Sequence, residues 1–185
     1  MERMFTRVAG WLFGCLLVAL SLFVAVETAL RKLIGVSLQG ADELGGYVLA
    51  LGGALAFTVA LLERAHVRID FLYSRIPSYL RTAIDLVCAL AFALLGLFLA
   101  RYGWPVVADT LAYGSNAPTA WATPMIWPQS AWYASLLTFT FASVWLAVRA
   151  FSLLLRGRHA EFERSLKPRA LDDELREELE DVARR

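Results

Sequence analysis

Four long apolar runs constrain this chain more than any other feature of its sequence. Because about 20 residues of α-helix cross the hydrocarbon core of a bilayer, each run is long enough to span a membrane. A backbone in lipid must satisfy its own hydrogen bonds, which favours helices for such runs. The sequence therefore predicts an all-α membrane protein with one membrane domain, residues 1–155, and four spans at about residues 8–30, 44–62, 82–111 and 131–155.

Composition supports this class. Hydrophobic residues make up 58% of the chain, more than soluble domains usually contain, and the net charge of +1 gives no reason to expect a nucleic-acid partner. The apolar run after Arg3 and Arg7 resembles a signal peptide, but it is longer than a usual cleavable core and lacks a convincing cleavage site. We expect it to remain as the first helix.

Lysine and arginine are unevenly distributed between the two ends of the spans. One side carries only Arg31, Lys32 and Arg101. The other side, formed by the N-terminus, the second loop and the C-terminal segment, carries Arg3, Arg7, Arg64, Arg68, Arg75, Arg81, Arg149, Arg156, Arg158, Arg164, Lys167 and Arg169. The positive-inside rule therefore predicts that both termini and the second loop lie in the cytoplasm.

Two cytoplasmic segments have their own patterns. Apolar residues at helical spacing, with arginines between them, predict a short interfacial amphipathic helix at about residues 69–76, in contact with membrane lipids and ended by Pro77. Residues 156–185 are rich in charge and predict a solvated tail.

Residue types that perform chemistry are sparse. The two histidines, His66 and His159, lie at the expected cytoplasmic ends, and Cys15 and Cys88 lack a C-x-x-C spacing. No phosphate-binding glycine loop or nucleophile elbow is present, so we expect no enzyme activity, no cofactor and no metal site. The charged residues Glu27, Asp85, Arg101 and Asp109 are expected near helix ends, within reach of water or headgroups.

Several residues are candidates for helix packing or subunit contacts. Gly10 and Gly14 form a G-x-x-x-G pair, and Gly52 lies among small residues of the second span, where backbones can approach closely. We expect Asp42 to cap the second helix. Glu43 follows in its first turn, either stabilising the helix dipole or contacting another subunit.

The segment from residue 102 to 129 is rich in tryptophan, tyrosine and proline. Trp121 and Trp127, followed by Pro128, are consistent with an interfacial aromatic belt. The alternative is a platform that packs against another protein, because aromatic residues often anchor interfaces.

Several of these segments together resemble a known family. They are Ala41-Asp42-Glu43-Leu44 with Tyr47, His66-Val67-Arg68-Ile69-Asp70, Ile76-Pro77, and Thr123-Pro124 through Pro128. In this order along four spans, over roughly residues 8 to 155, they resemble the DctQ-like small membrane subunit of tripartite ATP-independent periplasmic (TRAP) transporters.

The resemblance implies a scaffold or accessory subunit in the bacterial inner membrane. A periplasmic solute-binding protein would deliver an organic acid to a large membrane subunit, which moves it inwards with sodium and associates with this chain. The candidate subunit-interface or loop-fixing residues are Glu43, Gly52, His66, Arg68, Asp70, Trp121, Trp127 and Pro128. His66 and Asp70 could also simply pair across one helical turn. A stand-alone small carrier and the membrane anchor of an oxidoreductase remain alternatives.

Overall fold

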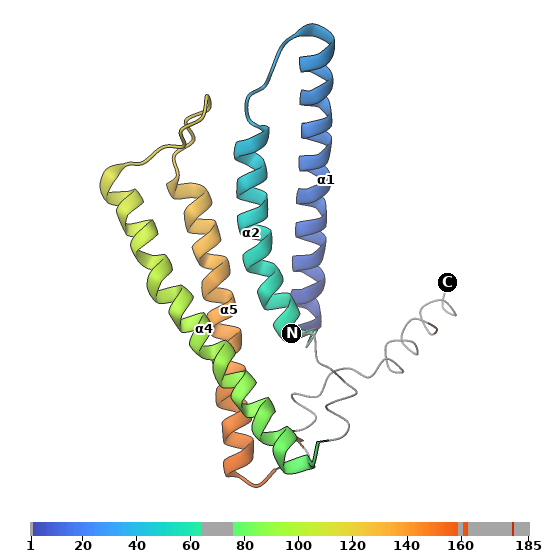
Figure 1. Ribbon diagram of the computed structural model, residues 1–185, viewed down its shortest axis with the longest axis vertical. Coiled ribbons are helices and arrows are strands. Elements are labelled where there is room, and N and C mark those ends of the chain that lie inside the picture. The colour runs from blue at the N-terminus through green and yellow to red at the C-terminus, as the bar shows by residue number, and fades with distance from the viewer. Residues whose placement is uncertain (1, 64–75, 159–160, 163–178, 180–185) are drawn as a thin grey trace.

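A computed structural model describes residues 2–63, 76–158, 161–162 and 179 of the chain. The expected interfacial helix, except Ile76, lies outside these residues, as does nearly all of the charged tail beyond Phe162. The described part contains the helices α1 (Glu2–Ile34), α2 (Ala41–Leu62), α4 (Ser78–Tyr113) and α5 (Ile126–Leu155) (Figure 1). Each helix is long and apolar enough to cross a membrane, which confirms the prediction of an all-helical chain with four candidate spans.

The ends of the helices follow from local sequence. α1 is followed by Gly35 with φ of 69°, and α4 by Gly114 with φ of 59°, whose N–H donates to the carbonyl of Thr110. Glycine adopts this left-handed conformation without steric cost, so it ends a helix cleanly. Pro77 directly precedes α4, where it fits because the first helical residues need no N–H partner.

The start of α2 differs from the expectation that Asp42 caps it. Gly40 is the N-cap residue and no side chain bonds to the free backbone N–H groups. Because the helix already begins at Ala41, Asp42 lies inside the first turn together with Glu43. Both carboxylates are therefore placed near the positive end of the helix dipole rather than at the capping position.

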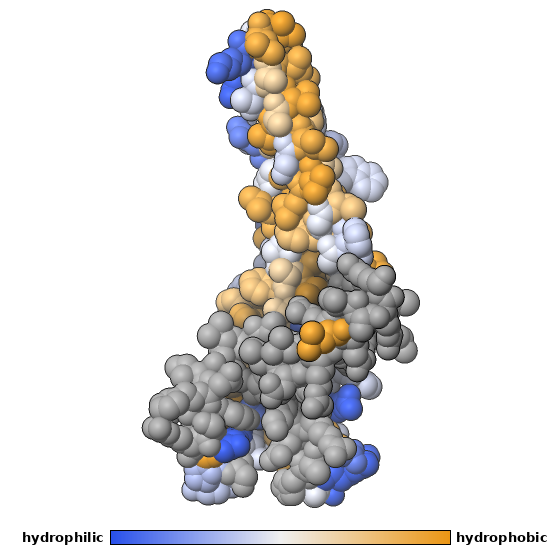
Figure 2. Space-filling view, turned by 90° about the vertical axis from the view of Figure 1, so that its right-hand side faces the viewer, coloured by the Kyte–Doolittle hydropathy of each residue, from blue (hydrophilic) through white to orange (hydrophobic). Residues whose placement is uncertain are grey.

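The helices form a single layer rather than a closed bundle. α1 packs on α2, α2 on α5, and α5 on α4, so α1 and α4 are the outer members of the row (Figure 1). Only 6% of the most apolar stretch of α1 is buried within the chain, against 39% for the central α5. The edge view in Figure 2 shows the outer side of α1 as a mainly apolar surface. Apolar side chains therefore cover most of the visible outer side of α1, as lipid contact requires.

α4 and α5 pack closely along a seam of small and hydroxyl residues. The hydroxyl of Thr140 donates to the carbonyl of Gly96 at 2.9 Å, and that of Tyr133 to the carbonyl of Ala100 at 3.1 Å. A Cβ atom at Gly96 would lie 3.0 Å from the Cα atom of Thr140. Only glycine therefore permits this approach of the two backbones.

The start of the C-terminal segment is part of the fold. After Leu155 the chain turns at Gly157, with φ of 68°, and the side chain of Phe162 becomes fully buried. It packs beside Ala150 and Leu153 of α5 and against apolar side chains that include Leu86 of α4. The first described residues of this segment thus pack against the beginning of α4 and the end of α5.

Candidate functional site at the connection end

The α1–α2 and α4–α5 connections lie at the same end of the molecule, here called the connection end (Figure 1). Residues 35–40 join α1 to α2, and residues 114–125 join α4 to α5. The second connection folds into a hairpin-like loop, in which the N–H of Ala117 donates to the carbonyl of Thr123 at 2.9 Å and that of Met125 to Ser115 at 3.0 Å. The loop turns back at Ala122, with φ of 46°.

Glu43 of α2 is the centre of the contacts that hold this loop. Its side chain is 7% exposed, and its carboxylate accepts a hydrogen bond from the hydroxyl of Tyr47 at 2.9 Å. The hydroxyl of Thr119, at the tip of the loop, donates to the other carboxylate oxygen. Thr123 also lies within hydrogen-bonding reach of this carboxylate. Burying a carboxylate is costly unless donors surround it, so these hydroxyls explain how Glu43 is accommodated.

Trp121 connects the same loop to the other connection. Its indole N–H donates to the carbonyl of Leu38 at 3.0 Å, and its ring meets Phe23 of α1 edge-on at 6.1 Å between centroids. The ring also lies directly over Gly40, where a Cβ atom would be 2.3 Å from the indole. Glycine is needed at position 40 because any side chain would displace the ring.

Glu27 of α1 fixes the first connection. The hydroxyl of Ser37 donates to its carboxylate at 3.0 Å and in turn accepts from the N–H of Gln39 at 3.2 Å. Glu27 is only 7% exposed, so the expectation that water or headgroups reach it is wrong. The reason is tertiary, because the chain after α1 folds back and places Ser37 beside the carboxylate. Asp85 of α4, also expected at an accessible helix end, is likewise buried at 4% exposure.

We call Glu27, Ser37, Glu43, Thr119 and Trp121 the loop clamp. Its contacts join the α1–α2 pair to the α4–α5 pair through the two connections. Among the described residues, no group of three or more histidine, cysteine, aspartate or glutamate side chains is arranged to hold a metal ion. The clamp is a set of fixing contacts, with hydroxyl and indole donors on carboxylate and carbonyl acceptors.

The other predicted site residues lie elsewhere. A Cβ atom at Gly52 would be 1.8 Å from the ring of Phe13, so this glycine faces α1 of the same chain. Trp127, in the first turn of α5, is 75% exposed, and Pro128 beside it is partly exposed. His66, Arg68 and Asp70 lie outside the described residues.

Sequence reasoning named Glu43 and Trp121 but not their partners. Thr119 is 76 positions from Glu43, and Leu38 is 83 positions from Trp121. No local pattern indicates pairs so far apart. The sequence marks Glu27 only as a charge near a helix end, and no pattern in it points to Ser37. A buried acid followed by a hydroxyl ten residues later is too common a combination to predict a contact.

A comparison with known protein families shows to which family the chain belongs. The family model "Tripartite ATP-independent periplasmic transporters, DctQ component" matches residues 20–155. This range contains all four helices except the first part of α1, and it contains every contact of the loop clamp. The chain belongs to the DctQ family. Neither a curated protein nor a solved structure matches it.

DctQ membership agrees with the helical architecture. The family is a component of TRAP transporters, not an enzyme family, and the chain is a multi-pass membrane protein by its four candidate spans. The matched range begins within α1, so Gly10 and Gly14 lie before it, and it ends at the last residue of α5.

Proposed function

We propose that this chain is the small scaffold subunit of a sodium-coupled TRAP transporter in the bacterial inner membrane, with both termini in the cytoplasm. It associates with the large membrane subunit and supports uptake of an organic acid delivered by a periplasmic solute-binding protein. The observation that carries the proposal is the family match over residues 20–155. The arginine distribution described above supports the orientation.

The fold supports a scaffold more than a carrier. A carrier usually encloses polar or unwound segments near the middle of the membrane. Here the described helices form one layer, and most polar groups of the loop clamp bond within the connection end, although Glu27 Oε2 is buried without a hydrogen-bond partner. A layer of helices has two broad faces and two edges, which suits lateral association with a larger membrane protein. No observation favours the stand-alone carrier or the oxidoreductase anchor.

The proposed orientation places the connection end in the periplasm, where the binding protein would arrive. Trp127 is then a candidate contact on the assembled transporter, because it is large, aromatic and 75% exposed. Trp121, the other candidate, makes its contacts within the chain. The two tryptophans therefore differ in role although they are six positions apart.

The test is reconstitution of uptake with defined components. The genes for a large multi-span permease and a periplasmic binding protein, expected beside the gene for this chain, supply the partners. Uptake of an organic acid into proteoliposomes under a sodium gradient should require all three proteins. Uptake that is equally fast without this chain would contradict the proposal. With the chain present, Trp127→Ala should slow uptake, while the stability of the isolated chain stays unchanged.

A further inference from the structure

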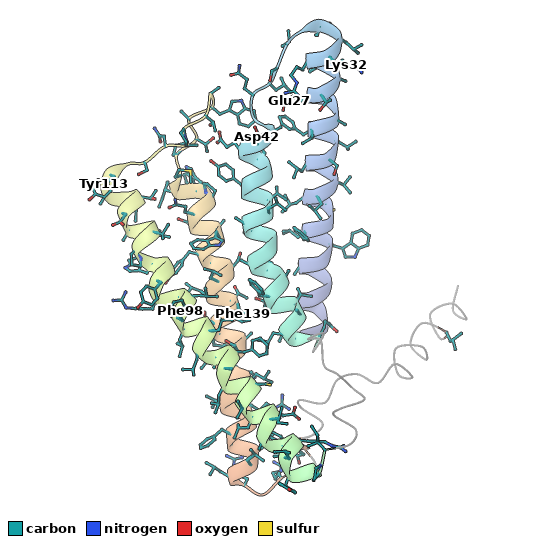
Figure 3. All side chains as sticks on the ribbon, in the orientation of Figure 1. Glu27, Lys32, Asp42, Phe98, Tyr113 and Phe139 are labelled. Atoms are coloured by element: carbon teal, nitrogen blue, oxygen red, sulfur yellow. The ribbon has the colours of Figure 1, made fainter. Side chains whose placement is uncertain are left out.

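α4 has a free edge that faces away from the rest of the described chain. Its contacts with α5 use one side of the helix, which includes the buried residues Ala89, Ala93, Gly96 and Val107. At 100° per residue, Leu94, Phe98 and Arg101 lie on a different side. All three are exposed, and Figure 3 labels Phe98, one turn from Arg101.

Arg101 is a charge within this apolar edge. Its guanidinium carbon lies 6.0 Å from the ring centroid of Tyr102, and that ring packs at 4.6 Å from the ring of Phe98. Among the described residues it has no ion-pair partner. Pro105 also has no N–H for the carbonyl of Arg101, so this turn of α4 presents both a cation and a backbone acceptor without its helical donor.

The position along the helix makes the absence of a partner significant. α4 continues for twelve residues beyond Arg101 to Tyr113, which is about 18 Å of helix. The candidate span includes this continuation, so the expectation that Arg101 lies near a helix end is wrong. Ionisable residues within spans generally face a partner or a water-filled cavity, because an unpaired charge in lipid is costly.

The opposite edge of the molecule provides a contrast. The outer side of α1 is lined by Gly10, Trp11, Gly14, Cys15 and Val18, and carries no charged side chain over this stretch. Figure 2 shows this edge as mainly apolar. Lipid tails alone can satisfy such a surface, whereas they cannot satisfy the guanidinium on the edge of α4.

We infer that the free edge of α4 around Phe98 and Arg101 binds a transmembrane helix of the transporter's large subunit, and that a carboxylate of that helix pairs with Arg101. The inference rests on the proposed function, and it adds which face of this chain contacts the large subunit. Phe98 and Tyr102 supply the aromatic contact area beside the ion pair, and they exclude lipid and water from it. The guanidinium suits a carboxylate because it can donate two parallel hydrogen bonds.

Co-purification of the tagged chain with the large subunit in mild detergent tests the ion pair. Arg101→Leu removes a charge from a span, so it should insert at least as well as the natural chain. It should nevertheless recover about tenfold less large subunit, since one partner of a desolvated charge pair is lost. Arg101→Lys keeps the charge and should retain most of the association. Arg149→Leu is the matched control, an exposed arginine on α5 that lies six residues from the end of its helix.

Photo-crosslinking in intact membranes tests the face independently of detergent stability. A benzoylphenylalanine residue at position 98 should crosslink to the large subunit, and the same residue at position 11, on the edge of α1, should not. Normal recovery with Arg101→Leu would show that a lipid headgroup or water satisfies the guanidinium, and it would overturn the inference. Crosslinks from position 11 but not 98 would do the same. If the natural chain recovers no large subunit at all, the proposed function fails first and the inference with it.

Discussion

The two helix pairs of this chain are held together in different ways. α4 and α5 approach closely along a seam in which Thr140 and Tyr133 bond to backbone carbonyls of the opposite helix. α1 and α2 meet where the ring of Phe13 fills the space over Gly52, and the loop clamp fixes their connection. Position in the layer does not explain the difference, because each pair has one outer and one inner helix, so it follows from the residues at each contact.

This comparison shows how helices associate when lipid surrounds them. Burial of apolar surface gives little advantage, since lipid tails are as apolar as leucine, so close packing and hydrogen bonds must supply the free energy. The α4–α5 seam uses both along its length. In the α1–α2 pair, close packing occurs at Gly52 and hydrogen bonds at the connection end. This pair should therefore tolerate substitutions better than the α4–α5 pair.

The largest effect is expected at Gly96. Its Cβ atom would meet Ser143 Oγ at 2.8 Å and the Cα atom of Thr140 at 3.0 Å, and a backbone atom cannot move aside alone. Gly96→Leu should therefore separate α4 from α5 and lower the free energy of unfolding by about 3 kcal/mol. Thermal unfolding of the purified chain in detergent, followed by helical circular dichroism, measures this.

The control for this variant is Gly46→Leu on α2, where an added Cβ atom would meet nothing within 4 Å. It should unfold close to the natural chain. If Gly46→Leu and Gly96→Leu were equally destabilised, the α4–α5 seam would not be the closely packed element of the layer.

A somewhat smaller effect is expected at Glu43, which joins the two pairs. Glu43→Ala leaves the hydroxyls of Tyr47 and Thr119 without their shared acceptor, and hydrogen bonds to a charged group contribute about 2 kcal/mol. The free energy of unfolding should fall by about that amount. Proteolysis within residues 114–125 should also become faster, because the loop is released from α2.

Asp42→Ala is the matched control for Glu43→Ala. Asp42 is the preceding residue, lies in the same helical turn and is exposed. Its loss should change stability only slightly and should leave proteolysis of the loop as it was. Equal proteolysis of the Glu43→Ala variant and the natural chain would show that Trp121 alone holds the loop.

The smallest effect is expected at Gly52. Gly52→Ala forces the ring of Phe13 away, but α1 has no other helix behind it and can shift toward lipid. A loss of about 1 kcal/mol follows, measured by the same thermal unfolding. Gly53→Ala, where a Cβ atom would meet nothing within 4 Å, should be neutral or slightly stabilising because alanine favours helix.

A second substitution sharpens this test. Phe13→Leu in the Gly52→Ala background makes room for the new methyl group, so the double variant should recover part of the lost stability. If the stability losses of Gly52→Ala and Phe13→Leu simply add in the double variant, the effect of Gly52→Ala does not come from the contact with Phe13.

The sequence by itself determined the class of this protein. Four apolar runs require four membrane-crossing helices, because no other structure of that length satisfies its backbone in lipid. The segments around Glu43, residues 66–70 and residues 123–128 indicated the DctQ family, and the family match covers residues 20–155. Local signals also predicted that α4 begins just after Pro77, since proline acts on its immediate neighbours.

Only the tertiary structure decided which side chains meet. It buries Glu27 under its own connection, brings Thr119 to Glu43 across 76 positions and directs Gly52 at Phe13. It also arranges the helices in a layer with two free edges, one mainly apolar and one bearing Arg101. Hydropathy could not reveal this, because residues facing lipid and residues facing another helix are equally apolar and differ only in shape and in their hydrogen-bond partners.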